Sequence, residues 1–259
     1  MARTLAGSDR ILVVNNFYST DFAAWTPAAC LSRLPVLGSD NELGQLLGRT
    51  CGLPVVALER NAATQFDIDT PVDLLLVRSH QAVGPHLRYY LDGLDLDSSR
   101  LDRALPLMTD SHAQVIVSGR IGLETLACLE KYTACRMRVF SEERGLRADG
   151  RLHRHEARSL LGFLLERTGL EEGFALLSEM GDAAFIDSRV LWAHFARWPS
   201  AGDRFLSDLG RVHEIEDEWL RAFTSAALTA PIPIVLGGHS LVSGGMYALV
   251  ESLNWEDGE

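Results

Sequence analysis

Residues 66–77, FDIDTPVDLLLV, constrain the fold more than any other part of the chain. Two aspartates, Asp67 and Asp69, alternate with apolar residues, so in an extended backbone both carboxylates leave one face while the apolar side chains enter a core. Thr70 is predicted to cap a helix that begins with Pro71, because proline suits the first helical position and threonine accepts free N–H groups of the first turn. The stretch therefore predicts a strand that is followed directly by a buried helix.

Apolar runs and helical patterns alternate along most of the chain. The apolar runs predict strands at residues 11–17, 53–58, 113–117, 135–140, 183–187 and 231–236. Because strands that alternate with helices form parallel sheets, the expected fold is α/β, a mostly parallel sheet with flanking helices. Two units are expected, residues 1–83 and 111–259, joined by a helical connection over residues 84–110.

Carboxylates at the end of a strand are candidates for a metal site. Asp69 is expected at the edge where ligands bind in open α/β sheets, and paired carboxylates are what Mg²⁺ uses beside a nucleotide. Asp187, which ends the run at residues 183–187, occupies a second such place. The alternative interpretation is that Asp67 and Asp69 only cap and solvate the turn.

The segment DIDTPVDL, residues 67–74, resembles the DxDTPEDL segment that closes the nucleotidyltransferase domain of the 2-phospho-L-lactate and molybdenum-cofactor guanylyltransferases and of CMP-sugar synthetases. The resemblance covers about residues 10–80. It implies that Asp69 is a Mg²⁺ ligand, and we expect Asp67 to support it.

A polar stretch overlaps the end of the first predicted strand and continues beyond it, and it includes Asn15, Asn16 and Asp21. Amide and carboxylate groups of this kind hydrogen-bond a sugar or a base, so we expect these three residues to contact the acceptor substrate. Asn-Asn followed by Ser-Thr-Asp is also ordinary turn chemistry, which leaves a purely structural role open.

The family's opening segment, a Gly-rich loop with Arg and Lys for the triphosphate and a first metal-binding Asp, has no counterpart ahead of the resemblance. A loop at residues 237–245 carries Gly237, Gly238 and Ser240 in the register of the family's GGxSxxxGxxxAL pattern. The Arg and Lys positions of that pattern are Val242 and Tyr247 here. The resemblance therefore implies either a rearranged site or a partner chain that supplies the missing half-domain.

Basic residues accompany another predicted strand, loop and helix. Arg120 lies in a glycine-bearing loop ahead of a helix predicted over residues 123–132. Seven arginines then fall within residues 136–158, beginning with Arg136 and Arg138 on one face of a strand. Arg120, Arg136 and Arg138 are therefore expected to bind a phosphate or carboxylate ligand. The alternative is that nearby glutamates neutralise the arginines internally.

The composition excludes several function classes. With 259 residues, 47% of them hydrophobic, the chain can bury a sizeable core, and its formal net charge of −11 argues against a nucleic-acid surface. Lys131 is the single lysine, so a Walker-type phosphate loop is absent. The four cysteines form no CxxC pair, which predicts reduced thiols in a cytoplasmic protein. No apolar run reaches 18 residues, so no membrane span is expected.

Together these patterns predict a Mg²⁺-dependent nucleotidyltransferase-like protein that acts on a phosphorylated small molecule and lacks its NTP-binding half. The expected ligand is a small-molecule phosphate or a nucleotide. The alternative function is that of a non-catalytic ligand-binding or partner subunit that retains the fold.

Overall fold

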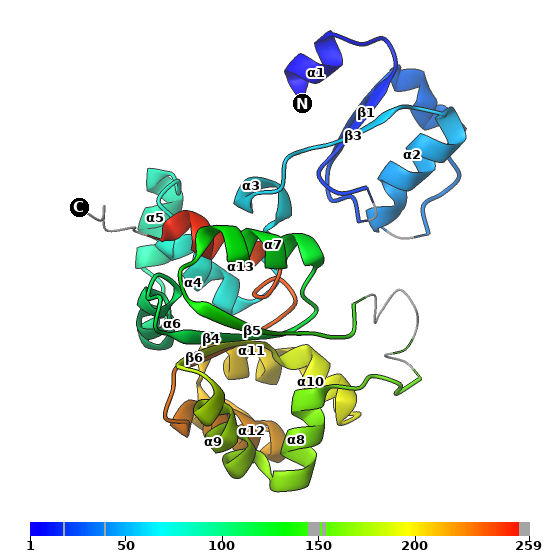
Figure 1. Ribbon diagram of the computed structural model, residues 1–259. Helices are drawn as coiled ribbons and strands as arrows, with labels where there is room; N and C mark the ends of the chain where they lie inside the picture. Colours follow the sequence, from blue (N-terminus) through cyan, green and yellow to red (C-terminus); the bar gives the residue numbers. More distant parts are fainter. Residues whose placement is uncertain (18, 39, 145–150, 152–153, 254–259) are drawn as a thin grey trace, which may run out of the picture. The chain divides into compact units, whose positions relative to one another are not determined.

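The computed structural model describes residues 1–259 except 18, 39, 145–150, 152–153 and 254–259, and it confirms the α/β class. The chain divides into two compact units, Met1–Gln65 and Phe66–Glu259 (Figure 1). This boundary lies earlier than the predicted limit at residue 83. The reason is that helix α4 (Pro71–Ser79) packs against helix α13 (Gly244–Ser252) and strand β7 (Ile234–Gly237), which belong to the second unit.

The first unit holds a three-stranded mixed sheet with the order β2-β1-β3. Strand β1 (Ile11–Val14) pairs antiparallel with β2 (Ala23–Thr26) and parallel with β3 (Val55–Ala57). Helix α2 (Leu43–Cys51) covers this sheet, and the remaining elements are α1 (Ala2–Ala6), η1 (Ala28–Arg33), η2 (Asp40–Glu42) and α3 (Ala62–Gln65). Strand β2, with the sequence AAWT, was not predicted, and its four residues are only half-buried.

The second unit is organised around a four-stranded parallel sheet with the order β5-β4-β6-β7. Its strands are β4 (Gln114–Gly119), β5 (Arg136–Ser141), β6 (Ala183–Asp187) and β7. The chain runs from β4 to β5 on one side and then to β6 on the other side of β4. The strand order therefore reverses between β4 and β6, and the carboxyl edge at such a reversal is where open α/β sheets bind ligands.

Both faces of strands β4, β6 and β7 are buried, because alternate residues of these strands enter different cores, whereas Arg136 and Arg138 of β5 are exposed. Val115 and Val117 of β4 belong to the core beneath α4, α7 (Leu123–Tyr132) and α13, whereas Ile116 belongs to the opposite core. Helices α8 (Leu160–Thr168), α9 (Leu170–Met180) and α12 (Glu218–Thr229) cover that opposite face (Figure 1). The other elements are α5 (Pro85–Asp92), α6 (Ser99–Ala104), η3 (Pro106–Met108), α10 (Ser188–His194), α11 (Ala201–Leu209) and η4 (Val212–Glu214).

Several predicted elements have the expected bounds, and others differ. The predictions for α7 and β6 are confirmed residue for residue. Residues 66–69 are not a strand, and Ile68 is 51% exposed, so the expected alternation between core and solvent does not occur there. Gly173 lies inside α9 and does not break it, because its missing Cβ makes room for Leu165 of the neighbouring helix.

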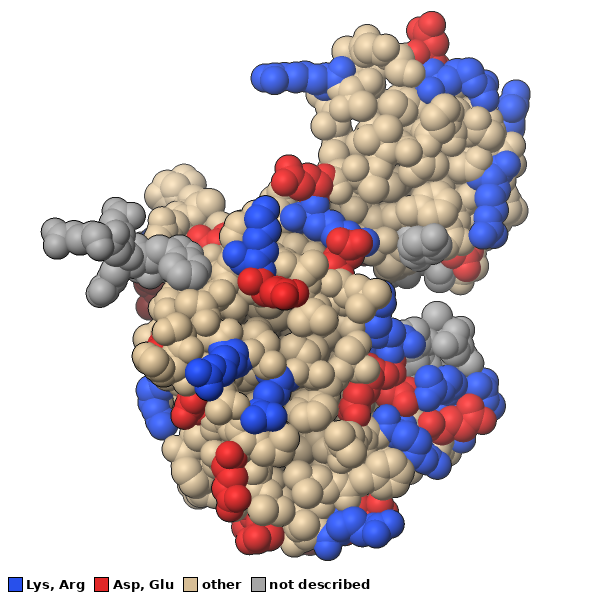
Figure 2. All heavy atoms as spheres, viewed as in Figure 1, with Lys and Arg blue, Asp and Glu red and all other residues tan. Residues whose placement is uncertain are grey.

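None of the helices in the described part of the chain is long and apolar enough to cross a membrane. Figure 2 shows basic and acidic side chains interspersed on the visible face of each unit.

Candidate functional site

An ion pair occupies the reversal point of the parallel sheet. Arg120, the residue after β4, donates from Nε to Asp187 Oδ2 at 2.6 Å and from Nη2 to Oδ1 at 3.1 Å. Asp187 ends β6, and its side chain is fully buried, whereas the Arg120 side chain is 16% exposed. Gly119 makes the pair possible, because it has φ +131° and any Cβ there would collide with the Asp187 side chain. The predicted anion-binding Arg120 thus has a carboxylate of the protein as its partner.

A second ion pair lies beside the first, in the interior. Arg189 donates from Nη2 to Asp208 Oδ2 at 2.6 Å, and its Nη1 donates to the other oxygen of Asp208 and to the hydroxyl of Ser188. The Ser188 hydroxyl in turn donates to the carbonyl of Gly237 at the end of β7. Burial raises the pKa of Asp208, while Arg189 opposes the rise. Burial alone lowers the pKa of Arg189, but Asp208, Asp187 and Asp73 raise it overall.

Sequence reasoning missed both members of this second pair. Arg189 lies two positions after Asp187, and this proximity to a candidate carboxylate could have pointed to it. Asp208 lies in a charged segment where no pattern sets it apart from its neighbours.

The start of helix α4 is held by the predicted capping box. Asp73 Oδ2 accepts hydrogen bonds from the N–H of Thr70 at 2.7 Å, from the Thr70 hydroxyl at 2.9 Å and from the N–H of Asp69 at 3.0 Å. Asp73 is fully buried, and its Oδ1 has no hydrogen-bond partner among the described residues. Burial raises the pKa of Asp73 to about 6, with a further contribution from Asp208, against the hydrogen bonds that lower it.

The glycine loop after β7 lies against the segment that precedes α4. The Ser240 hydroxyl donates to the carbonyl oxygen of Asp67, 173 positions away in the sequence. A Cβ at Gly238 would lie 3.1 Å from Thr70 Cγ2, and one at Gly237 would lie 2.7 Å from Val72 Cγ1. The structure therefore brings together two segments that are far apart in the sequence, one with Asp67 and Thr70 and the other with Gly237, Gly238 and Ser240.

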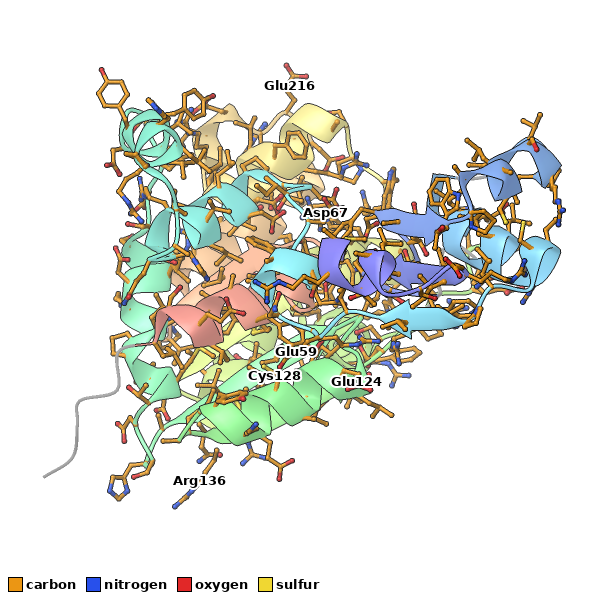
Figure 3. All side chains as sticks on the ribbon, turned by 90° about the horizontal axis from the view of Figure 1, so that it is seen from above. Glu59, Asp67, Glu124, Cys128, Arg136 and Glu216 are labelled. Atoms are coloured by element: carbon orange, nitrogen blue, oxygen red, sulfur yellow. The ribbon has the colours of Figure 1, made fainter. Side chains whose placement is uncertain are left out.

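Both aspartates of the proposed metal site are exposed at this junction. The pKa of Asp67 is raised, first by desolvation and second by the charge of Asp69, so the two carboxylates are close enough to repel each other. Figure 3 shows Asp67 on the segment that leads into α4. Mg²⁺ is commonly held by one or two carboxylates with waters and substrate phosphates, and this donor set fits that pattern. In the described residues there is no group of three or more His, Cys, Asp or Glu side chains that could hold a metal.

Positive groups gather at the adjoining strand ends. His239 contacts the carbonyl oxygen of Arg120 through Nε2 at 3.1 Å, which joins the loop after β7 to the loop after β4. Although His239 reaches solvent, the surrounding protein lowers its pKa by desolvation, and the charges of Arg120 and Arg144 lower it further. The Arg144 guanidinium lies over Gly122, since a Cβ there would be 3.7 Å from Nη2.

Arg136 and Arg138 do not join this group. In the parallel register Arg136 lies opposite Gln114 and Ser141 lies opposite Gly119, so Arg136 is at the amino edge of the sheet. Six residues at about 3.3 Å each separate it from Arg120, a distance of about 20 Å. Figure 3 shows Arg136 well away from Asp67. Arg138 donates instead to Gln114 Oε1 at 3.1 Å. The expected site for one ligand on Arg120, Arg136 and Arg138 does not form, because the strand separates them.

The alternative of internal neutralisation applies to part of the arginine-rich segment. Arg151 pairs with Glu143 at 2.7 Å, and Arg154 pairs with Glu156 at 2.8 Å. Arg147 belongs to the predicted cluster but lies outside the described residues.

In the first unit, the polar stretch forms a closed turn. Asn15 is 3% exposed, and its Nδ2 donates to Asp21 Oδ2 at 2.7 Å and to a main-chain carbonyl. Its Oδ1 accepts from the N–H groups of Asp21 and Phe22. The Asn15 amide is therefore used to hold the turn, whereas Asp21 and the half-buried Asn16 remain at the surface.

A hollow of about 370 Å³ lies between η4 and α12, with Arg211, His213 and Leu228 among its lining residues. It contains none of the predicted site residues and none of the strand ends, so the carboxyl edge of the sheet, with its convergent polar groups, is the candidate site.

Comparison of the chain with protein-family models, with characterised proteins and with solved structures gives no match, and the resemblance to nucleotidyltransferases stays a prediction.

Proposed function

We propose that this protein is a Mg²⁺-dependent nucleotidyltransferase-like enzyme that acts on a phosphorylated small molecule. The observation that carries the proposal is the hydrogen bond from the Ser240 hydroxyl to the Asp67 carbonyl. It joins the segment that resembles the end of a nucleotidyltransferase domain to the loop that resembles its beginning. If the end of the domain precedes its beginning in this chain, a single site requires that the two segments lie close together, and the hydrogen bond supports this.

The charges around this edge support a phosphate ligand. Asp67 and Asp69 supply carboxylates on one side, and Arg144 supplies positive charge near His239 on the other, whereas the charge of Arg120 is paired with Asp187. The Arg and Lys positions of the family pattern are Val242 and Tyr247, which are buried and uncharged. Arg144, from a different loop, would replace only one of these two positive charges, so turnover by the chain alone should be slow.

In the proposed reaction Asp69 holds the metal and Asp67 supports it. Mg²⁺, when bound, neutralises charge that develops on the α-phosphate as pyrophosphate leaves. The glycines at 237 and 238 let this loop pack closely against the start of α4, because a Cβ at either position would meet Val72 or Thr70. The buried pair of Arg120 and Asp187 fixes the loop beneath these groups.

The second candidate is a non-catalytic ligand-binding or partner subunit. The burial of Val242 and Tyr247 favours it, because neither side chain contributes positive charge to the Gly-rich loop. Such a protein would bind the ligand at the same edge without releasing pyrophosphate.

Binding is tested by calorimetric titration of the full chain with ATP, GTP and CTP in the presence and absence of Mg²⁺. Asp69→Asn is expected to remove the Mg²⁺-dependent part of the affinity and to leave the melting temperature within a few degrees, because Asp69 is exposed. Asp92→Asn, at an exposed carboxylate near the end of α5, is the matched control and should bind as the wild type does. Equal Mg²⁺-dependent affinity in wild type and Asp69→Asn would contradict the metal assignment.

A further inference from the structure

Two cysteines lie against each other in the core of the first unit. Cys30 belongs to η1 and Cys51 is the last residue of α2, and they are 2% and 6% exposed. The Cys51 thiol donates to the main-chain carbonyl of Cys30 at 3.5 Å. Both residues are in their free form.

Cys30 also acts on the Cys51 thiol. The pKa of Cys51 is raised, first by burial and then by hydrogen bonding with the Cys30 side chain and by its charge. The two cysteines of the second unit have different surroundings. The Cys135 thiol contacts the sulfur of Met137 at 3.4 Å, and Cys128 lies half-buried on α7. The geometry thus singles out Cys30 and Cys51 as a pair.

We propose that Cys30 and Cys51 form a reversible intrachain disulfide when the protein meets a hydroperoxide. One thiol, as its thiolate, attacks the peroxide oxygen, which gives a sulfenic acid and releases one water or alcohol. The second thiol then attacks the sulfenic sulfur, so that the S–S bond forms and a water leaves. The two thiols lose two electrons and two protons, and the peroxide is reduced by the same amount.

The position of Cys51 gives the oxidant access. It is the last residue of α2 and precedes Gly52, which has φ +58°, and helix ends open more readily than helix centres. Burial disfavours the thiolate, so the reaction should be slow in the closed unit and faster when this helix end opens.

The bond would restrain more than the two cysteines. It would tie η1 to α2, across residues 31–50, in a unit whose fully buried apolar core consists of Leu12, Val14, Cys30, Leu47, Cys51 and Leu53. Just ahead of α2, Asn41 donates to the Ser19 hydroxyl at 2.6 Å and accepts from the N–H of Thr20. Oxidation would therefore stiffen the polar turn of the first unit together with α2. This inference does not depend on the proposed enzymatic function.

The experiment treats the reduced full chain with hydrogen peroxide, blocks the remaining thiols by alkylation under denaturing conditions and maps tryptic peptides without reduction. The expected product is peptide 11–33 linked to peptide 50–60, with loss of two of the four free thiols. The melting temperature of the first unit should rise by on the order of 10 °C and return after dithiothreitol.

The double variant Cys128→Ala, Cys135→Ala is the matched control and should give the same linked peptide. Cys30→Ala should give none, and the wild-type map decides the question even if that variant fails to fold. Four alkylatable thiols after peroxide treatment, or linkage only through Cys128 or Cys135, would overturn the proposal.

Discussion

The buried carboxylate of Asp73 should make the stability of the second unit depend on pH in an identifiable way. Its pKa is about 6 in the folded protein, against an ordinary value of 3.8, chiefly because burial disfavours the charged form. Between these two pH values the folded state holds a proton that the unfolded state releases. The free energy of unfolding therefore falls as the pH rises from about 4 to about 6.

The size of the effect follows from the pKa difference. A shift of about two pH units corresponds to about 3 kcal/mol, which is lost in full above the folded-state pKa. Asp73→Asn removes this titration and keeps an amide oxygen that can accept from the N–H groups of Asp69 and Thr70. The variant should therefore gain stability relative to wild type as the pH rises. The charge of Asp208 contributes to the raised pKa of Asp73, and the charge of Asp73 contributes to the raised pKa of Arg189, so the substitution will also alter the titration of this neighbouring ion pair.

The assay is urea denaturation of wild type and Asp73→Asn at pH 4.5, 5.5, 6.5 and 7.5, followed by tryptophan fluorescence. The difference in free energy of unfolding between the two proteins should change by about 2–3 kcal/mol across this range, since most of the titration falls within it. Asp92→Asn should run parallel to wild type. A difference between wild type and Asp73→Asn that stays constant with pH would refute the assignment of a raised pKa to Asp73.

Three further predictions concern the same edge of the sheet. Arg120→Ala should destabilise the protein by about 3 kcal/mol in urea, because Asp187 is left buried without its partner, and adding Asp187→Ala should restore part of the loss; no recovery would contradict this account. Gly119→Ala should cost more than about 2 kcal/mol, since the new Cβ meets Asp187, whereas Gly84→Ala, where the space is open, should cost under about 1 kcal/mol. The isolated chain should release little pyrophosphate from ATP, GTP or CTP with phosphorylated acids and sugars as acceptors, because losing even one preorganised donor typically costs about 10²–10³ in rate. Robust turnover that Asp69→Asn abolishes would contradict this prediction and would show that Arg144 and its neighbours replace the missing groups.

The sequence by itself determined the local structure of the second unit. Strand β6 and helix α7 were predictable to the residue, because apolar runs and helical spacing act over a few neighbouring positions. The capping box of Thr70 and Asp73 was readable for the same reason, since its members are three residues apart. The α/β class followed from the alternation of such elements.

Only the tertiary structure decided which of the candidate residues meet. Ser240 and Asp67 are adjacent because β7 packs beside β6 and α13 packs against α4, and no local pattern contains that information. Arg120 and Arg136 are close in sequence but lie at opposite edges of the sheet, because parallel strands separate their two ends by the length of the strand. The ion pairs of Arg120 with Asp187 and of Arg189 with Asp208 depend in the same way on contacts between distant segments, so their charges could be counted in the sequence but not paired.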